Sequence, residues 1–294
     1  HILLTGGRGQ VGLALQHAAW PENVVFHAPG RDALDIADAG AIDRMLGSAP
    51  FAAVLNAAAY TAVDKAETDA SNAIRCNTLA PALLAEASAR AGVPLLHLST
   101  DYVFDGRADR PYVETDPTNP LGVYGHSKRA GESAVLAANP RALVIRTAWV
   151  ISEYRSNFLK TMLRLAEDRD IVSVVDDQSG RPTCAGDLAN ALITLITRVA
   201  NDPSAPHGLY HLANAGETTW ADLAEYIFEC SSRNGGAFAT VQRIPTHLYP
   251  TPAARPMNSR LDCRKIEDDF GIKMRPWQAA VSDVVAGLNN GAGG

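Results

Sequence analysis

Short apolar runs alternate with longer amphipathic stretches through the first half of the chain. The apolar runs occupy residues 2–5, 24–28, 52–58, 94–99 and 142–147, and the amphipathic stretches occupy residues 10–19, 38–46, 71–91 and 123–138. Strands separated by helix-length crossovers form parallel sheets with helices on both faces. The pattern therefore predicts an α/β fold with a doubly wound parallel sheet of the Rossmann type, whose ligands bind beyond the carboxyl ends of the strands.

The alternation loosens after about residue 150. Helices are expected at residues 156–167, 186–199, 220–230 and 277–287, strands at 171–175 and 208–213, and a loop rich in Pro and Arg at 246–260. This pattern favours a Rossmann domain at residues 1–150 and a smaller C-terminal α/β lobe at 151–288, partly interleaved with the first. Residues 289–294, with the sequence NNGAGG, are expected to form a flexible tail.

The composition disfavours several classes of function. A hydrophobic content of 47% predicts a sizeable globular core, and a net charge of −6 without a Lys/Arg block disfavours nucleic acid as a partner. The chain lacks an apolar run of about 18 residues, and its first residues lead directly into a strand-like segment, so we expect neither a membrane span nor a signal peptide. The four cysteines lack CxxC spacing and the histidines form no HExxH motif, which favours reduced thiols, a cytoplasmic location and no bound metal.

A glycine-rich segment follows the first apolar run. Gly6, Gly9 and Gly12 stand at GxxGxxG spacing between a predicted strand and a predicted helix. The unpaired N–H groups of a helix amino-terminus attract phosphate, and glycines let the phosphate approach the backbone. The segment predicts a dinucleotide site, although a tight structural turn has the same glycines.

The end of the second apolar run bears on the choice of cofactor. Enzymes that bind NAD commonly carry an acidic residue directly after this strand. This chain reads APGRDALD there, with no carboxylate at the expected position. Arg31 can receive the 2′-phosphate of NADPH, so NADPH is favoured and NADH stays possible. The third run ends in NAAAYT, residues 56–61, whose small side chains leave room for a cofactor or simply pack in the core.

A tyrosine and a lysine four residues apart open the helix predicted at 123–138. Tyr124 and Lys128 then share one helix face, and Thr100 ends the preceding strand. A phenol beside a cation and a hydroxyl suits proton transfer to a carbonyl oxygen. The tyrosine–lysine pair alone is weak evidence, because a surface helix can carry it by chance, but with the glycine segment it favours a reductase.

Three further residues are candidates for contacts with substrate. Trp149 ends the fifth apolar run, where it is either a substrate contact or part of the core. Arg255 and Arg260 flank a PMNS segment in the late loop, where guanidinium groups can grip a nucleotide diphosphate or can be ordinary surface arginines.

Together these motifs resemble the extended short-chain dehydrogenase/reductases over nearly the whole chain, and within them the dTDP-4-dehydrorhamnose reductase family. The segments that carry the resemblance are GGRGQVG, NAAAYTAVDKAE, STDYVF, YGHSKRAGE, IRTAWV, NFLKTMLRLA, DDQSGRPT, GLYHLAN and PTPAARPMNSRL. The resemblance implies reduction of the 4-keto group of dTDP-4-dehydro-6-deoxy-L-mannose by NADPH, which yields dTDP-L-rhamnose for cell-surface polysaccharide synthesis.

The resemblance also implies a role for individual residues. Tyr124 protonates the forming alkoxide, Lys128 holds the nicotinamide ribose and lowers the pKa of the phenol, and Thr100 orients the carbonyl. Sugar contacts fall on Asp101 and Trp149. The implied cofactor contacts are Gly9, Gln10, Val11, Asp35, Ile36, Ala59, Tyr60 and Thr61, with Asp35 and Ile36 beside the adenine.

Two positions depart from the family pattern. Ala14 stands where some relatives carry a glutamate in a magnesium-bridged dimer, which disfavours a metal and that dimer and leaves a monomer or homodimer open. Ile151 replaces a more usual tyrosine, with Tyr154 a few residues late, which affects the local sugar contacts.

Two other readings of function stay open at this point. A nucleotide-sugar epimerase or dehydratase of the same fold uses a tightly held NAD and favours the acidic residue that is missing after the second strand. A non-catalytic nucleotide-binding regulatory subunit can keep the tyrosine–lysine pair without turnover.

Overall fold

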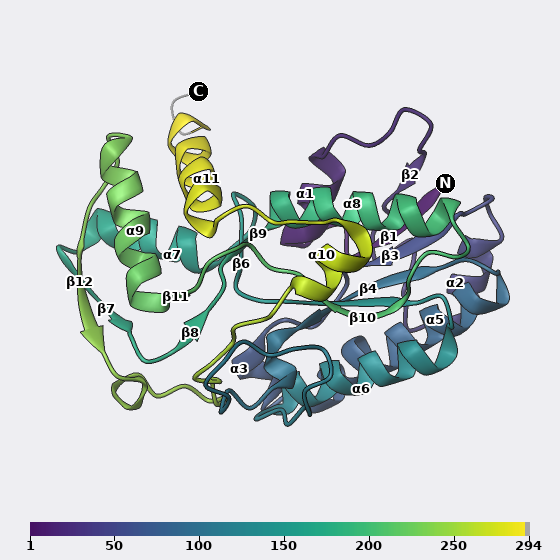
Figure 1. Cartoon of the computed structure of the whole chain (residues 1–294), viewed down its shortest axis with the longest axis horizontal. Helices are drawn as coiled ribbons and strands as arrows, with labels where there is room; N and C mark the ends of the chain where they lie inside the picture. The colour runs from purple at the N-terminus through teal and green to yellow at the C-terminus, as the bar shows by residue number, and fades with distance from the viewer. Residues whose placement is uncertain (292–294) are drawn as a thin grey trace.

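A six-stranded parallel sheet forms the centre of the computed structural model, which describes residues 1–291 (Figure 1). The strand order is β10-β5-β4-β3-β1-β2, and every neighbouring pair is parallel. The strands are β1 (Ile2–Thr5), β2 (Phe26–His27), β3 (Ala53–Asn56), β4 (Leu95–Thr100), β5 (Leu143–Thr147) and β10 (Gly208–His211). The predicted fold class is confirmed.

Helices cover both faces of this sheet (Figure 1). Alternate strand residues point to opposite faces, so Leu4 packs in one apolar cluster and Leu3 in another. The first cluster includes residues of α1 (Gln10–His17), α8 (Ala185–Asn201) and α10 (Arg264–Phe270), and the second includes residues of α2 (Ala39–Leu46), α5 (Ala80–Arg90) and α6 (Val123–Ala138). The strand order reverses at β1, which creates a crevice at the carboxyl ends of the strands.

A smaller lobe packs around its own apolar cluster beside the sheet (Figure 1). Its main elements are α7 (Phe158–Asp168), β7 (Ile171–Val175), α9 (Trp220–Arg233), β12 (Thr240–Ile244) and α11 (Trp277–Gly291). The short strands β6 (Val150–Ile151), β8 (Ser179–Gly180), β9 (Thr183–Cys184) and β11 (Thr218–Thr219) pair as β6–β9 and β8–β11. The chain crosses between the two parts, because α8 and β10 follow residue 150 yet belong to the layers of the large sheet.

The stretch at 71–91 differs from the single helix that its pattern predicts. It forms α4 (Ala70–Ile74), a π-helical turn η1 (Arg75–Leu79) and then α5, and α3 (Val63–Ala66) precedes them. The side chain of Asn77 in this turn bonds the backbone of Tyr60 and the hydroxyl of Ser127. A Cβ on Gly131 of α6 would lie 2.0 Å from the backbone oxygen of Asn77, so the π-helical turn packs directly on α6.

The remaining short elements are η2 (Asp101–Val103) and η3 (Thr246–Leu248), the latter inside the predicted loop at 246–260. Helix α11 continues to Gly291, so part of the expected tail is helical, and residues 292–294 lie outside the described residues. Within residues 1–291, no helix combines the length and the apolar character that crossing a membrane requires.

Candidate functional site

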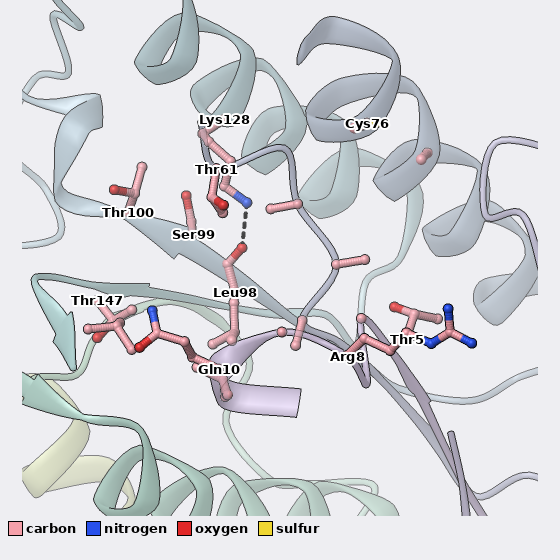
Figure 2. Close-up of a pocket in the computed structure, with 18 of the residues that line it drawn as sticks. Thr5, Arg8, Gln10, Thr61, Cys76, Leu98, Ser99, Thr100, Lys128 and Thr147 are labelled. Atoms are coloured by element: carbon pink, nitrogen blue, oxygen red, sulfur yellow. Dashed lines mark hydrogen bonds between the residues drawn. The ribbon is translucent and has the colours of Figure 1, made fainter. Parts of the chain in front are cut away.

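A cavity of about 660 Å³ opens at the carboxyl ends of β1, β3, β4 and β5 (Figure 2). Most of the residues selected from the sequence line it, although they come from segments far apart along the chain. Those residues are Gly6, Gly9, Gln10, Val11, Arg31, Asp35, Ile36, Ala59, Thr61, Thr100, Asp101, Tyr124, Lys128 and Trp149. The motifs for cofactor, proton transfer and substrate therefore share one cavity.

The glycine loop has a shape that side chains would prevent. Gly6 has φ +77°, and a Cβ there would lie 2.4 Å from the Ala58 nitrogen. Gly12 does not line the cavity but sits where α1 meets the loop, and its Cβ would lie 2.2 Å from the Gly6 oxygen. Gly9 is exposed and meets only the Gly6 oxygen, at 3.4 Å. The loop thus presents open backbone to the cavity at the start of α1.

Tyr124 and Lys128 lie one turn apart at the start of α6, and both side chains are buried. Burial raises the pKa of Tyr124 to about 12, and the Thr100 hydroxyl acts in the opposite direction. Burial lowers the pKa of Lys128 to about 8, against the charge of Glu132. Lys128 Nζ donates to the Leu98 carbonyl at 2.6 Å (Figure 2). The phenol pKa is therefore not lowered as expected, because desolvation outweighs other influences in this structure.

Several buried polar atoms lack partners below the cavity. Within residues 1–291, Ser99 Oγ, Asp101 Oδ2 and Thr147 Oγ1 make no hydrogen bond, although all three residues line the cavity. Thr100 Oγ1 donates to the other Asp101 oxygen at 2.9 Å. Burial raises the pKa of Asp101 to about 6. Native proteins rarely leave buried polar atoms unpaired, so this group indicates a polar ligand.

Trp149 is held in an unusual backbone conformation at the cavity edge. Its φ is +47°, in the left-handed region that bulky residues rarely adopt. Its ring stacks on Trp220 with centroids 3.5 Å apart and an interplanar angle of 9°, and Phe158 packs on Trp220 in turn. A Cβ on Gly180 would lie 2.3 Å from the Trp149 ring. Trp220 of α9, which Phe158 of α7 supports, and Gly180 of β8 therefore hold the partly exposed Trp149 ring at the edge of the cavity.

The end of β2 gathers three guanidinium groups around the cavity. Arg31 and Arg8 are exposed, and Arg8 lies 3.1 Å from the position of a Cβ on Gly30. Arg75 from η1 pairs with Asp35 at 2.7 Å. A hydrogen bond from the Ala37 backbone and the Arg75 charge lower the pKa of Asp35 against the effect of burial. Within residues 1–291, Arg31 and Arg8 make no ion pair, and both line the cavity.

Three other candidates lie away from the cavity wall. Arg255 pairs with Asp64 at 2.9 Å, and Arg260 pairs with Glu217 at 2.9 Å, so neither arginine lines the cavity. The Tyr60 hydroxyl donates to Asp69 at 3.0 Å outside the cavity. The roles expected of these residues stay predictions, and the structure does not bring them together with the others.

The two positions that depart from the family pattern are both buried. Ala14 lies in the apolar cluster that α1, α8 and α10 form against the sheet, and Ile151 lies in the apolar cluster of the smaller lobe. Tyr154 stacks on His17 with ring centroids 5.3 Å apart and does not line the cavity. Among residues 1–291, no group of three or more His, Cys, Asp or Glu side chains is placed to hold a metal ion.

Sequence reasoning missed several residues that line the cavity. Among them are Arg8, Arg75, Cys76, Thr147 and Trp220. Arg8 stands inside the glycine segment and Thr147 at a strand end, so position alone was a usable signal for both. Arg75 and Cys76 face the cavity from the π-helical turn, and Trp220 reaches it from the smaller lobe, and no local pattern marks any of these three.

The chain is similar to known proteins over nearly its whole length. A family model described as "RmlD substrate binding domain" matches residues 1–290. The dTDP-4-dehydrorhamnose reductase of Sinorhizobium fredii is 43% identical over 288 residues, which cover 98% of this chain and 97% of that protein. The Escherichia coli K12 protein of the same name is 41% identical over 286 residues, covering 96% and 95%.

Solved structures give the same result. The crystal structure of a dTDP-4-dehydrorhamnose reductase from Clostridium acetobutylicum superposes with a TM-score of 0.90 at 35% identity, covering 98% of this chain and 99% of that one. The Bacillus anthracis reductase in complex with NADP superposes with a TM-score of 0.89 at 30% identity, covering 96% and 97%. The chain therefore belongs to the dTDP-4-dehydrorhamnose reductase family.

Proposed function

We propose that this chain catalyses the NADPH-dependent reduction of the 4-keto group of dTDP-4-dehydro-6-deoxy-L-mannose to dTDP-L-rhamnose. The observation that carries the proposal is the convergence of Tyr124, Lys128 and Thr100 in the cavity that the glycine loop also lines. Full-length similarity to reductases of that name supports the choice of substrate. We place the reaction in the cytoplasm, in the synthesis of cell-surface polysaccharide, by a monomer or homodimer.

The residues present fit a nicotinamide dinucleotide. Gly6 and Gly9 keep the loop backbone open to a pyrophosphate, and a relative with 30% identity binds NADP. Gln10 and Val11 follow at the start of α1, and Ala59 and Thr61 line the opposite wall. Arg31, helped by Arg8, would hold the 2′-phosphate, which favours NADPH over NADH. Asp35 and Ile36 would lie beside the adenine.

The chain's own residues supply the proton. A reduced nicotinamide held in this cavity would supply the hydride for the carbonyl carbon. With a pKa of about 12, Tyr124 is neutral at physiological pH, so the phenol holds the proton that the alkoxide oxygen needs. The Thr100 hydroxyl would hold that oxygen in place after turning its single proton away from Asp101, which accepts it in this structure. Lys128, charged below about pH 8, would place positive charge near the phenolate that remains and would bind the nicotinamide ribose.

The sugar would lie between Asp101 and Trp149. Asp101 offers an unpaired buried oxygen that can accept from a sugar hydroxyl, and Trp149 lines the cavity with an apolar side chain. A role for Arg255 and Arg260 at the diphosphate requires both to leave their present partners, Asp64 and Glu217.

The test follows NADPH absorbance after addition of the 4-keto sugar nucleotide to the purified chain. Stoichiometric loss of NADPH with formation of the 4-hydroxy sugar supports a reductase. Isomerised product without net loss of NADPH supports the epimerase or dehydratase reading instead. Binding without chemistry supports the regulatory reading. Thermal-shift measurements with dTDP, UDP and GDP then identify the preferred base, because a ligand that binds the folded state raises the Tm.

A further inference from the structure

Four polar side chains form a connected series of polar contacts beneath the cavity. Thr5 Oγ1 donates to Asn56 Oδ1 at 2.6 Å, and Asn56 Nδ2 lies 2.9 Å from His97 Nδ1. His97 Nε2 lies 3.5 Å from Lys128 Nζ. Asn56 and His97 are completely buried, and neither lines the cavity. This series thus joins the end of β1, through β3 and β4, to the lysine on α6.

The hydrogen bonds of Asn56 determine which nitrogen of His97 carries the proton. The Ala58 backbone N–H donates to Asn56 Oδ1 at 3.0 Å, and a backbone N–H can only donate. The Asn56 oxygen therefore faces Ala58, and its NH₂ group faces His97 Nδ1. Nδ1 must accept, so a neutral His97 carries its proton on Nε2. Burial, together with the Lys128 charge, keeps the pKa of His97 well below its ordinary value.

This tautomer limits what Lys128 can do. His97 offers Lys128 an N–H donor and no acceptor, so an ammonium proton gains nothing by turning toward the imidazole. Lys128 Nζ donates one hydrogen bond to the Leu98 carbonyl at 2.6 Å. Its remaining N–H groups are left for the cavity, which Tyr124 and the cofactor-binding wall line.

We propose that His97 is a positioning residue of the reductase, which acts through Lys128 by presenting an Nε2–H that directs the lysine N–H groups into the cavity. Asn56 fixes the tautomer, and Thr5 with the Ala58 backbone fixes Asn56. The inference rests on the proposed function for its catalytic consequence, but the tautomer itself is independent of turnover.

A second buried histidine gives a matched comparison within the same sheet. His211 Nδ1 lies 3.0 Å from the Tyr112 carbonyl, and its Nε2 lies 3.4 Å from Arg146 Nη1. A carbonyl only accepts, so His211 carries its proton on Nδ1 and its Nε2 can accept from Arg146. Arg146 is paired with Glu132 and does not line the cavity. The two histidines therefore use opposite tautomers beside a cation, and only His97 faces the catalytic lysine.

The first experiment measures the tautomers in the unsubstituted protein. Long-range ¹H–¹⁵N spectra of a sample with ¹⁵N-labelled histidine distinguish protonated from unprotonated ring nitrogens, and H97F and H211F assign the signals. We expect His97 as the neutral Nε2–H tautomer, with no titration near its ordinary pKa of about 6.5. We expect His211 as the Nδ1–H tautomer. An Nδ1–H tautomer for His97, or its titration near that pH, overturns the proposal.

The second experiment compares kcat, the KM for the sugar nucleotide and Tm in H97F, H97Q and H211F. Misdirected Lys128 should lower kcat of H97F by about tenfold to a hundredfold with little change in KM. H97Q should recover part of kcat, because its amide NH₂ reaches the position of Nε2. The Tm of H211F should fall by about as much as that of H97F, whereas the kcat of H211F should stay unchanged. Equal kcat in H97F and the unsubstituted protein, or equal loss in H97Q and H97F, contradicts the role.

A third variant covers the case in which H97F does not fold. Asn56→Asp keeps the size of the side chain but replaces the NH₂ donor with an acceptor, so His97 must protonate Nδ1 and Nε2 becomes an acceptor for Lys128. We expect the tautomer signal to invert and kcat to fall, and the buried carboxylate should also lower the Tm. An inverted tautomer with unchanged kcat overturns the proposal. Absence of any turnover in the unsubstituted protein contradicts the proposed function instead, and leaves the tautomer measurement to decide whether His97 is arranged as described.

Discussion

At the scale of single residues, one physical cause sets the protonation of both Tyr124 and Lys128. Burial disfavours charge, so it raises the pKa of the phenol to about 12 and lowers the pKa of the ammonium to about 8. The phenol therefore enters the reaction as a proton donor, whereas Lys128 changes charge close to physiological pH. The role expected of Lys128, to favour the phenolate, becomes important only after the proton has left Tyr124.

Replacing Tyr124 with Phe removes the proton donor and keeps the ring. We expect kcat to fall by about 10²–10⁴, the usual contribution of a positioned proton donor, while the Kd of NADPH changes little. Steady-state kinetics and a fluorescence titration of NADPH measure the two quantities. Tyr102, whose ring packs edge-on against Tyr124 at 5.6 Å, offers a control: Y102F keeps the Tyr124 phenol and should retain far more of kcat. Y124F activity above about a tenth of normal contradicts the assignment.

Replacing Arg31 with Ala tests the preference for NADPH. Arg31 is exposed at the cavity, so its loss should remove a charged contact to the 2′-phosphate and leave the fold unchanged. We expect the KM for NADPH to rise about tenfold or more and the KM for NADH to stay constant. Arg90, which pairs with Asp43 on the surface away from the cavity, provides the control variant R90A. An equal change for both cofactors argues against contact with the 2′-phosphate.

At the scale of elements, backbone packing holds the glycine loop against α1. Gly12 contacts the loop backbone so closely that a Cβ would overlap Gly6 and Gly7. The loop and the helix therefore keep their geometry only while this position lacks a side chain. This requirement is independent of any contact between Gly12 and a cofactor.

Replacing Gly12 with Ala should displace the loop from α1. The new Cβ would lie 2.2 Å from the Gly6 oxygen and 2.7 Å from Gly7 Cα, both backbone atoms that cannot rotate away. We expect a loss of about 1–3 kcal/mol in the free energy of unfolding and a clear loss of NADPH affinity. Urea unfolding and a cofactor titration measure them. Gly287→Ala in α11, where no atom lies within 4 Å, should instead stabilise by about 0.5–1 kcal/mol. Unchanged NADPH affinity in G12A would show that the loop tolerates the displacement.

The sequence predicts elements and strand-end residues better than it predicts ion pairs. Tyr124 and Lys128 are placed by helical spacing and Thr100 by its strand end, and all three line one cavity. Arg255 does not line the cavity, because it pairs with Asp64, a residue far away in the sequence. Such a partner is invisible to local pattern, since only the folded chain brings the two charges together.

The same limit explains the residues that were missed. Trp220 begins α9 in the smaller lobe and lines the cavity beside Trp149, on which its ring stacks. Arg75 and Cys76 line the cavity because they lie in the π-helical turn. The hydrophobic periodicity of residues 71–91 predicts one continuous helix and gives no sign of this turn. Long-range packing decides both features, and neither propensity nor spacing records it.

At the scale of the whole molecule, the cavity lowers the stability of the protein. Asp101 is fully buried with one oxygen unpaired, and its pKa is raised from 3.8 to about 6. Between these two values the folded protein binds more protons than the unfolded chain, so the free energy of unfolding falls as the pH rises through this window. Above about pH 6 the penalty is fully present, and a pKa difference of this size corresponds to about 3 kcal/mol.

Replacing Asp101 with Asn should remove this penalty. The Asn oxygen can still accept from Thr100, and the side chain stays neutral at every pH, so we expect D101N to exceed the unsubstituted protein in Tm by about 5 °C at pH 8 and by little at pH 4. Asp116 provides a control of opposite sign: its bond to Arg110 lowers its pKa, so D116N should lower the Tm at pH 8. If Asp101 is also a sugar contact, D101N gains its stability with a higher KM for the sugar nucleotide. A Tm difference that does not grow between pH 4 and pH 8 would show that Asp101 carries no buried charge, and the polar site beneath the sugar would need another explanation.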